Sequence, residues 1–163
     1  MIGNRSVDEL RFIIDHNVGK LVRWLRMLGF DSLFFNGEDD ADMVKQALAE
    51  GRIILTRDTG IMKRRVISRG QVKAVLIKSD EPEEQIRQLM TELDIKDRSQ
   101  PFTLCLECNR PLVARTPDEV REKVPPYVFK TQKQYVECPA CRRIYWRGTH
   151  WAAMLHKLEK LGG

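Results

Sequence analysis

The stretch RFIIDHNVGKLVRWLRMLGF (residues 11–30) contains two periodicities that decide the fold class. Its first five residues, RFIID (11–15), form a short apolar run that is typical of a buried strand. In residues 20–28 apolar side chains recur at helical spacing, until Gly29 ends the pattern. The stretch therefore predicts a strand followed by a helix, with Asp15 at the end of the strand.

The same alternation continues along the chain to residue 93. Apolar runs predict further strands, and segments with helical spacing lie between them. The expected strands are residues 30–35, 53–56 and 74–78, and the expected helices are residues 40–50, 58–68 and 82–93. Strands that alternate with helices predict an α/β fold, in which helices cover both faces of a parallel sheet. Functional side chains of such sheets gather at the carboxyl ends of the strands.

The periodicity stops at KDRSQP (96–101), where a turn-rich, basic region begins that contains all four cysteines. We therefore expect two modules, residues 10–98 and residues 99–163. The second module closes on a predicted helix, residues 151–161, for which Thr149 can serve as the N-cap.

The cysteines form two C-x-x-C motifs, CLEC (105–108) and CPAC (138–141). Each motif presents two thiolates at a separation that suits tetrahedral zinc, and a module with a small core gains folding free energy from the metal. We expect Cys105, Cys108, Cys138 and Cys141 to bind one structural Zn²⁺ in a ribbon with an inserted loop. A redox pair and unrelated buried cysteines are the alternatives. Four thiolates leave no open coordination position, so we assign this zinc no catalytic role.

Basic residues concentrate in the cysteine-containing region. The 163 residues include 28 Lys and Arg and 23 Asp and Glu, a net charge of +5. Residues 1–100 contain 17 basic and 17 acidic side chains, whereas residues 101–163 contain 11 and 6. A positive surface favours phosphate-rich partners such as RNA. The sequence has neither a bilayer-spanning apolar run nor a signal-peptide pattern, so we expect a cytoplasmic protein with no membrane partner. The oligomeric state stays open.

Aspartates follow two of the predicted strands: Asp15 ends the first, and Asp58 follows the third within LTRD. Asp40 continues the sheet-facing apolar stripe of the second predicted helix, and Asp39 is the alternative to it. Carboxylates gathered at one edge can hold Mg²⁺ or Mn²⁺, which activates water and stabilises the leaving oxygen of a phosphodiester. Helix capping is the competing interpretation, because Asp is a common N-cap residue. Asp80 is a weaker fourth candidate.

Basic side chains flank these aspartates on two predicted helices. On the first helix they form a stripe opposite the apolar face, and on the third they follow Asp58. Such side chains can hold the phosphates on either side of a scissile bond, although a solvated surface explains each of them singly. The residues expected to bind substrate are Lys20, Arg23, Arg57, Lys63 and Arg64. Thr56 is expected to orient a bound water.

Several segments together resemble the Mut-seven C-terminal ribonuclease family, whose PIN-like nuclease domains carry a C-terminal zinc ribbon. They are FIIDHNVGKLVRWLRMLGFDS (12–32), DDADMVKQALAEGRIILTRDTGIMKRR (39–65), and the cysteine pairs with RIYWRGTHW (143–151). The resemblance implies a PIN-like three-layer α/β/α fold followed by a zinc ribbon and a C-terminal helix. It also implies divalent-metal-dependent RNase activity, with acidic ligands matched by Asp15, Asp40 and Asp58. His16 and Asn17 stand where the family more usually has small or apolar residues.

The leading hypothesis is a Mg²⁺- or Mn²⁺-dependent endoribonuclease. Asp15, Asp40 and Asp58 would hold the metal, while the basic helices and the zinc ribbon bind RNA. A non-catalytic RNA- or ribosome-binding module with a decayed PIN-like fold is the alternative from another class. The toxin of a toxin-antitoxin pair is a third hypothesis, which the ribbon makes less favourable.

Overall fold

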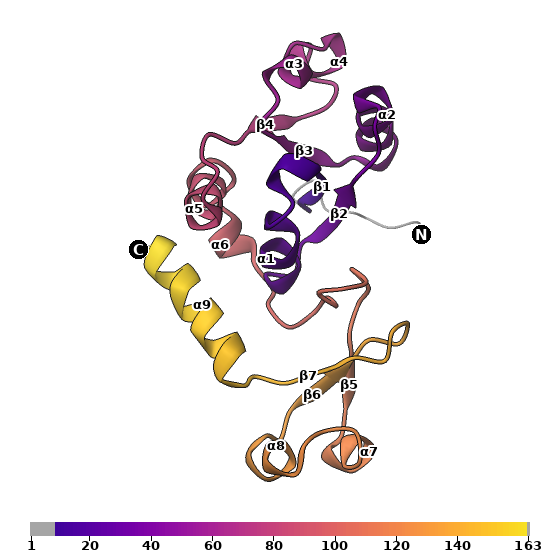
Figure 1. Ribbon diagram of the computed structural model, residues 1–163, viewed down its shortest axis with the longest axis vertical. Coiled ribbons are helices and arrows are strands. Elements are labelled where there is room, and N and C mark those ends of the chain that lie inside the picture. Colours follow the sequence, from indigo (N-terminus) through magenta and orange to yellow (C-terminus); the bar gives the residue numbers. More distant parts are fainter. Residues whose placement is uncertain (1–8, 163) are drawn as a thin grey trace.

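A four-stranded parallel sheet forms the centre of the first unit (Figure 1). The computed structural model describes residues 9–162. All neighbouring strands run parallel, so their carboxyl ends lie along one edge of the sheet. The strands are β1 (Arg11–Asp15), β2 (Asp31–Phe35), β3 (Ile53–Thr56) and β4 (Ala74–Leu76), in the order β2-β1-β3-β4.

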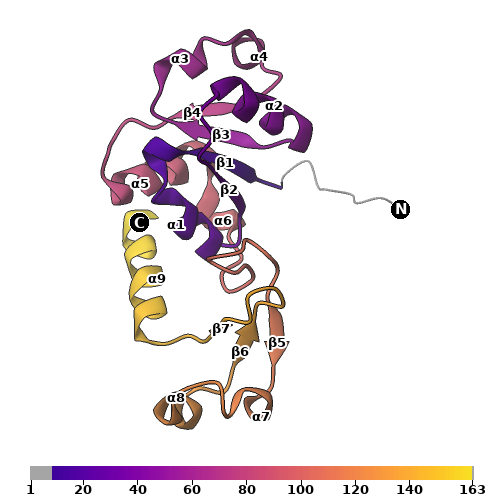
Figure 2. The same ribbon diagram turned by 45° about the vertical axis from the view of Figure 1, so that its right-hand side comes forward.

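Helices cover both faces of this sheet, which confirms the expected three-layer α/β/α arrangement (Figure 2). One face carries α1 (Leu21–Met27) and α5 (Pro82–Leu93), and the other carries α2 (Asp40–Glu50), α3 (Thr59–Met62) and α4 (Arg65–Ser68). Strand β1 shows why its sequence is continuously apolar: Phe12 and Ile14 pack with α1 and α5, whereas Ile13 packs with α2. A short 3-10 turn, η1 (His16–Val18), joins β1 to α1.

The single helix expected at residues 58–68 is in fact two short helices, α3 and α4. Between them, Arg64 has an extended backbone (φ −64°, ψ 141°). Ile61 and Val66 pack in the same apolar cluster against the sheet. Residues five positions apart would face different sides of one continuous helix, so the break turns both side chains towards the core.

The second unit is a three-stranded antiparallel ribbon, reached through α6 (Ile95–Arg98). Its strands are β5 (Val113–Arg115), β6 (Tyr135–Glu137) and β7 (Ile144–Tyr145), in the order β5-β6-β7. The insertion between β5 and β6, expected as a loop, contains α7 (Pro117–Val120) and α8 (Pro126–Thr131). It folds because it has a small core of its own, formed by Val120, Val124, Val128 and Tyr135.

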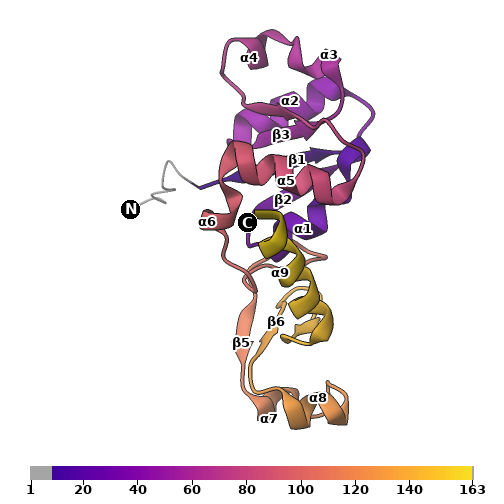
Figure 3. The ribbon, with the colours of Figure 1, turned by 90° about the vertical axis from the view of Figure 1, so that its left-hand side faces the viewer.

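The last helix, α9 (Thr149–Gly162), leaves the ribbon and runs back along α5 of the first unit (Figure 3). Trp151 and Leu158 join the same buried cluster as α1 and α5, and Lys157 Nζ lies 2.9 Å from Glu83 Oε1. The helix therefore belongs with residues 99–163 in sequence but with the first unit in packing. No helix within the described residues is both long and apolar enough to cross a membrane.

Candidate functional site

The four cysteine sulfur atoms converge where the ribbon meets the first unit, all within 4.8 Å of one another. The two C-x-x-C turns have matching backbone hydrogen bonds. In the first turn, the N–H of Cys105 donates to the carbonyl of residue 110 (2.9 Å), and the N–H of Asn109 donates to the carbonyl of Cys105 (3.0 Å). In the second turn, the N–H of Cys138 donates to the carbonyl of residue 143, and the N–H of Arg142 donates to the carbonyl of Cys138, both at 2.9 Å. Each turn therefore holds its two sulfur atoms on the same side before any ligand is considered.

The electrostatics of this cluster favour a bound cation. Burial by itself would raise the pKa of the Cys138 thiol, but backbone N–H groups of Cys141 and Ala140 act on its sulfur and lower the pKa to about 7. The pKa of Cys108 rises to about 12, first through its hydrogen bond with Cys141 and then through burial. One thiolate therefore forms readily near neutral pH, whereas the Cys108 thiol resists ionisation unless a metal offsets the charge. The donor set fits tetrahedral Zn²⁺, which all four cysteines can bind together.

Tyr145 of β7 supports the cluster from outside. Its hydroxyl lies 3.2 Å from Cys105 Sγ and accepts a hydrogen bond from the N–H of Leu106 (3.3 Å). Burial is the main cause that raises the pKa of Tyr145, so the hydroxyl stays protonated and can donate to the sulfur. Contacts of this kind orient metal ligands.

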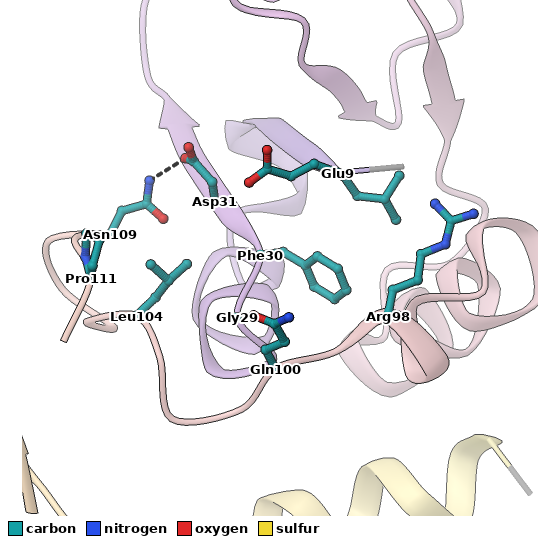
Figure 4. Close-up of a pocket in the computed structure, with 10 residues that line it drawn as sticks. Glu9, Gly29, Phe30, Asp31, Arg98, Gln100, Leu104, Asn109 and Pro111 are labelled. Atoms are coloured by element: carbon teal, nitrogen blue, oxygen red, sulfur yellow. Dashed lines mark hydrogen bonds between the residues drawn. The ribbon is translucent and has the colours of Figure 1, made fainter. Parts of the chain in front are cut away.

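The first cysteine turn also attaches the ribbon to the edge strand β2. Asn109 has a positive φ of 60°, and its Oδ1 accepts from the N–H of Ser32 (2.9 Å). Its Nδ2 donates to Asp31 Oδ1 (2.6 Å; Figure 4). Arg26 of α1 adds hydrogen bonds to the carbonyls of Leu106 (2.9 Å) and Ser32 (3.1 Å). The first cysteine turn therefore both presents two sulfur atoms to the cluster and attaches the ribbon to the first unit.

A cavity of about 420 Å³ lies beside this attachment, at the amino-terminal edge of the sheet (Figure 4). Asp31 lines it and is held by Arg52 Nη1 (2.8 Å) and Arg11 Nε (3.3 Å). Burial alone would raise the pKa of Asp31, but the hydrogen bonds from Arg52 and Asn109 outweigh burial and lower it. This carboxylate is thus a paired structural charge, on the opposite edge from the strand ends where catalytic residues gather.

Asp15 ends β1 and is almost fully buried, with 3% of its surface exposed. Its Oδ1 accepts from the N–H of His16 (2.9 Å) and lies 3.0 Å from His16 Nδ1. Its Oδ2 accepts from the Thr56 hydroxyl (2.7 Å) and from Asn17 Nδ2 (3.3 Å). Both carboxylate oxygens therefore have protein donors, as a buried carboxylate requires. His16 and Asn17 are thus both direct partners of Asp15.

Thr56 connects Asp15 to Asp58. Its hydroxyl donates to Asp15 and accepts from the backbone N–H of Asp58 (3.0 Å). The side chain of Asp58 is exposed and caps α3, because its Oδ1 accepts from the N–H of Gly60 (2.8 Å). Strands β1 and β3 are neighbours, so the two aspartates lie at one edge of the sheet, one buried and one open to solvent.

Asp39 and Asp40 have different roles at the start of α2. Asp39 is the N-cap, and its Oδ1 accepts from the N–H of Ala41 (2.9 Å). Asp40 is the first helical residue, and its carboxylate has no hydrogen bond or ion pair with the side chains and backbone that the structure describes. The carboxylate oxygens of Asp15, Asp40 and Asp58 do not form a closely spaced group among the described residues. Within the described part of the chain, the cysteines are the only group of three or more metal-binding side chains with closely spaced ligand atoms.

Four of the expected substrate-binding residues lie on the first unit without an ion pair to the described residues. Lys20 lines a depression beside Asp15, together with the fourth acidic candidate, Asp80. The exposed Arg57 donates its backbone N–H to Asn17 Oδ1 (3.2 Å). The other two are Lys63 and Arg64, which are exposed at the junction of α3 and α4.

The basic stripe expected on α1 is divided between two surroundings. Lys20 lies at the carboxyl edge of the sheet, whereas Arg23 faces the ribbon, with its Nη1 2.7 Å from Glu107 Oε1. Arg26 faces the ribbon as well. The sequence did not predict the contacts of Arg23, Arg26 and Asn109 between the ribbon and the first unit. Its one signal for them was the Asn that follows the first cysteine pair, since Asn tolerates a positive φ better than most residues.

One comparison with known proteins gives a match that covers nearly the whole chain. The family model described as Mut7-C RNAse domain matches residues 10–158. No curated protein and no solved structure matches the chain. The match spans the parallel sheet with its aspartates, both cysteine turns and most of α9. The chain therefore belongs to the Mut7-C RNAse domain family.

Proposed function

We propose that this protein is a Mg²⁺- or Mn²⁺-dependent endoribonuclease whose reaction centre is the carboxyl edge of the parallel sheet. The observation that carries the proposal is the position of Thr56 at the end of β3. Its hydroxyl donates to the buried carboxylate of Asp15 on the neighbouring strand and accepts from the backbone N–H of Asp58. The family description, an RNAse domain, supports RNA as the substrate class.

In this proposal Asp15, Asp58 and Asp40 hold the divalent ion. When bound, it would activate a water and offset the charge that develops on the phosphodiester oxygens. Asp15 is the fixed ligand, because Thr56 and the backbone of His16 set its orientation. Asp58 and Asp40 are the adjustable ligands. Asp58 is the exposed N-cap of α3, and Asp40 is the first residue of α2, with a partly exposed side chain. Thr56 positions Asp15 and the backbone of Asp58 at once.

The zinc ribbon is proposed to bind RNA without taking part in the reaction. The exposed Arg142 and Arg143 line a hollow together with Tyr145 and Trp146. The cations suit phosphates and the aromatic rings suit bases. The exposed cations of α3 and α4 would contact the phosphate backbone beside the aspartates. We place this function in the cytoplasm, whose reducing conditions keep the four thiols available for zinc.

Asp58→Asn tests the proposal, because Asn is an equally good N-cap and should keep α3 folded. We expect cleavage of a circular single-stranded RNA, which has no ends, to depend on Mg²⁺ or Mn²⁺ and to be lost in this variant. Divalent ions should be omitted from the buffer, not chelated, so that the zinc stays bound. Asp97→Asn, which changes an exposed aspartate of α6, is the matched control and should cleave normally. Equal cleavage by both variants would refute the proposal.

A non-catalytic RNA-binding module is the second candidate, and two observations favour it. Both oxygens of Asp15 already accept hydrogen bonds from the protein, and the carboxylates of Asp15, Asp40 and Asp58 do not form a closely spaced group among the described residues. This candidate predicts RNA binding without cleavage and no heat of Mn²⁺ binding at millimolar metal. Calorimetric titration of the native chain and of Asp58→Asn distinguishes the two functions, since the nuclease should bind Mn²⁺ and lose that binding in the variant.

A further inference from the structure

A depression of about 390 Å³ adjoins Asp15 at the carboxyl edge of the sheet, and the proposed reaction does not use most of it. It lies on the α1 side, and His16 and Asn17, the direct partners of Asp15, form its border with the acidic centre. Its volume is within the range of pockets that bind small ligands. Lys20, Phe34, Asp80 and Gln85 also line the depression.

Phe34 gives this depression an exposed aromatic wall. It is the penultimate residue of edge strand β2, and it is 46% exposed. Its ring lies close against Gly19: a Cβ added at residue 19 would be 3.0 Å from Phe34 Cε1. The glycine thus allows the ring to rest on the chain and to keep one side open to solvent.

Gln85 provides a second, independent observation. Its side chain lies beneath the depression with 2% of the residue exposed, and its Nε2 donates to the carbonyl of Ser79 (2.9 Å). Its Oε1 is buried and has no hydrogen-bond partner among the described residues. Buried acceptors are nearly always paired, so this oxygen indicates a missing donor. Because neighbouring atoms cover it, a ligand would reach it only after a small side-chain displacement.

We propose that this depression binds one nucleotide of the RNA, with the base stacked on Phe34 and its phosphate at Lys20. The inference rests on the proposed function, which supplies the RNA. The ligand class follows from three features that occur together: an open aromatic face, a cation, and acceptors at Gln85 and Asp80 for the N–H and O–H groups of a base and ribose. Stacking tolerates every base, so the subsite positions the chain beside Asp15 without strict sequence specificity.

Nuclear magnetic resonance of the full, zinc-loaded chain tests the subsite without requiring catalysis. The probe is adenosine 5′-monophosphate in buffer without added Mg²⁺ or Mn²⁺. We expect shifts of the Gly19 backbone amide and the Gln85 side-chain amide. Phe34→Ala should weaken binding by about tenfold, the effect of losing one aromatic stack, and Phe34→Tyr should restore it. Leu48→Ala is the matched control, because it removes another exposed apolar side chain, 52% exposed in the last turn of α2.

Two further titrations and one assay separate the outcomes. Inorganic phosphate and ribose 5-phosphate should bind more weakly than the nucleotide; equal binding would mean a phosphate site only and would overturn the stacking proposal. Unchanged nucleotide shifts in Phe34→Ala would overturn it too. If Asp58→Asn abolishes RNA cleavage while Phe34→Ala binds the nucleotide normally, the nuclease stands and the subsite fails. If nucleotide binding depends on Phe34 but the native chain does not cleave RNA, the subsite stands and the nuclease proposal fails.

Discussion

The two candidate metal sites of this chain are built in different ways. The cysteine site takes its ligands in pairs from two short turns, each with the same backbone hydrogen bonds, and its sulfur atoms already lie within 4.8 Å of one another. The aspartate site takes single carboxylates from β1, from the residue after β3 and from the start of α2. Asp15 accepts a hydrogen bond from the Thr56 hydroxyl, Asp58 caps α3, and Asp40 is the first residue of α2.

The difference shows what local sequence can assemble. A C-x-x-C turn fixes two ligands within four residues, so its geometry depends little on the rest of the fold. Carboxylates from separate elements meet only if the sheet, its crossovers and a cation bring them together, because like charges repel one another. The first site should therefore respond mainly to loss of a ligand, and the second to changes in position.

The largest effect is expected from Cys138→Ser. Bound zinc should fall from about one ion per chain, measured by elemental analysis, and amide hydrogens of the ribbon should exchange rapidly, because structural zinc contributes on the order of 10 kcal/mol to such modules. Amides of β1 and β3 should stay protected, since both strands are buried between helices of the first unit on both faces of the sheet. Ala140→Ser alters the same turn without removing a ligand and should keep its zinc. A ribbon that stays protected without zinc would contradict this account of the cysteine site.

A pair of adjacent alanine substitutions tests the aspartate site. Asp40→Ala should lower metal-dependent RNA cleavage by about 100-fold or more, since even outer-shell residues contribute 10–100-fold at metal sites. Asp39→Ala should instead lower the free energy of unfolding by about 1 kcal/mol through loss of the N-cap and leave cleavage intact. Cleavage rates and urea unfolding of both variants are the measurements. The opposite pattern would assign the metal to Asp39, the alternative that the sequence left open.

The smallest effect is expected at the residues after each cysteine pair, which share a positive φ. Asn109→Gly loses two hydrogen bonds to β2, one of them to the charged Asp31, and should lower the free energy of unfolding by about 1–2 kcal/mol. Arg142→Gly relieves a left-handed backbone but removes an exposed cation from the buried Glu137. Glu137 keeps Arg115 and Lys123 as partners, so the loss of unfolding free energy should be smaller than for Asn109→Gly. Urea unfolding of the zinc-loaded variants gives both values. Equal losses would mean that Asn109 does not fix the ribbon to the first unit.

Much of the architecture could be predicted from the sequence because its signals are local. The apolar run of β1, the helical spacing of α1 and the cysteine spacing each report on fewer than about 15 neighbouring residues, which is the range over which periodicity is informative. The resemblance to a nuclease family also came from such segments, and the family match confirmed it. Failures occurred where packing decided: the helix at residues 58–68 is broken so that Ile61 and Val66 can both reach the sheet.

The sequence by itself determined the parallel α/β order, the two cysteine pairs that form one cluster, and the set of aspartates at strand and helix ends. Only the tertiary structure decided which of these aspartates are tied to the protein: Asp15 to Thr56, Asp39 to α2, and Asp40 to none of the described residues. It also decided that Arg23 faces the ribbon while Lys20 stays beside Asp15. The physical reason is that hydrogen bonds and ion pairs join residues up to 84 positions apart, and no local pattern encodes such distances.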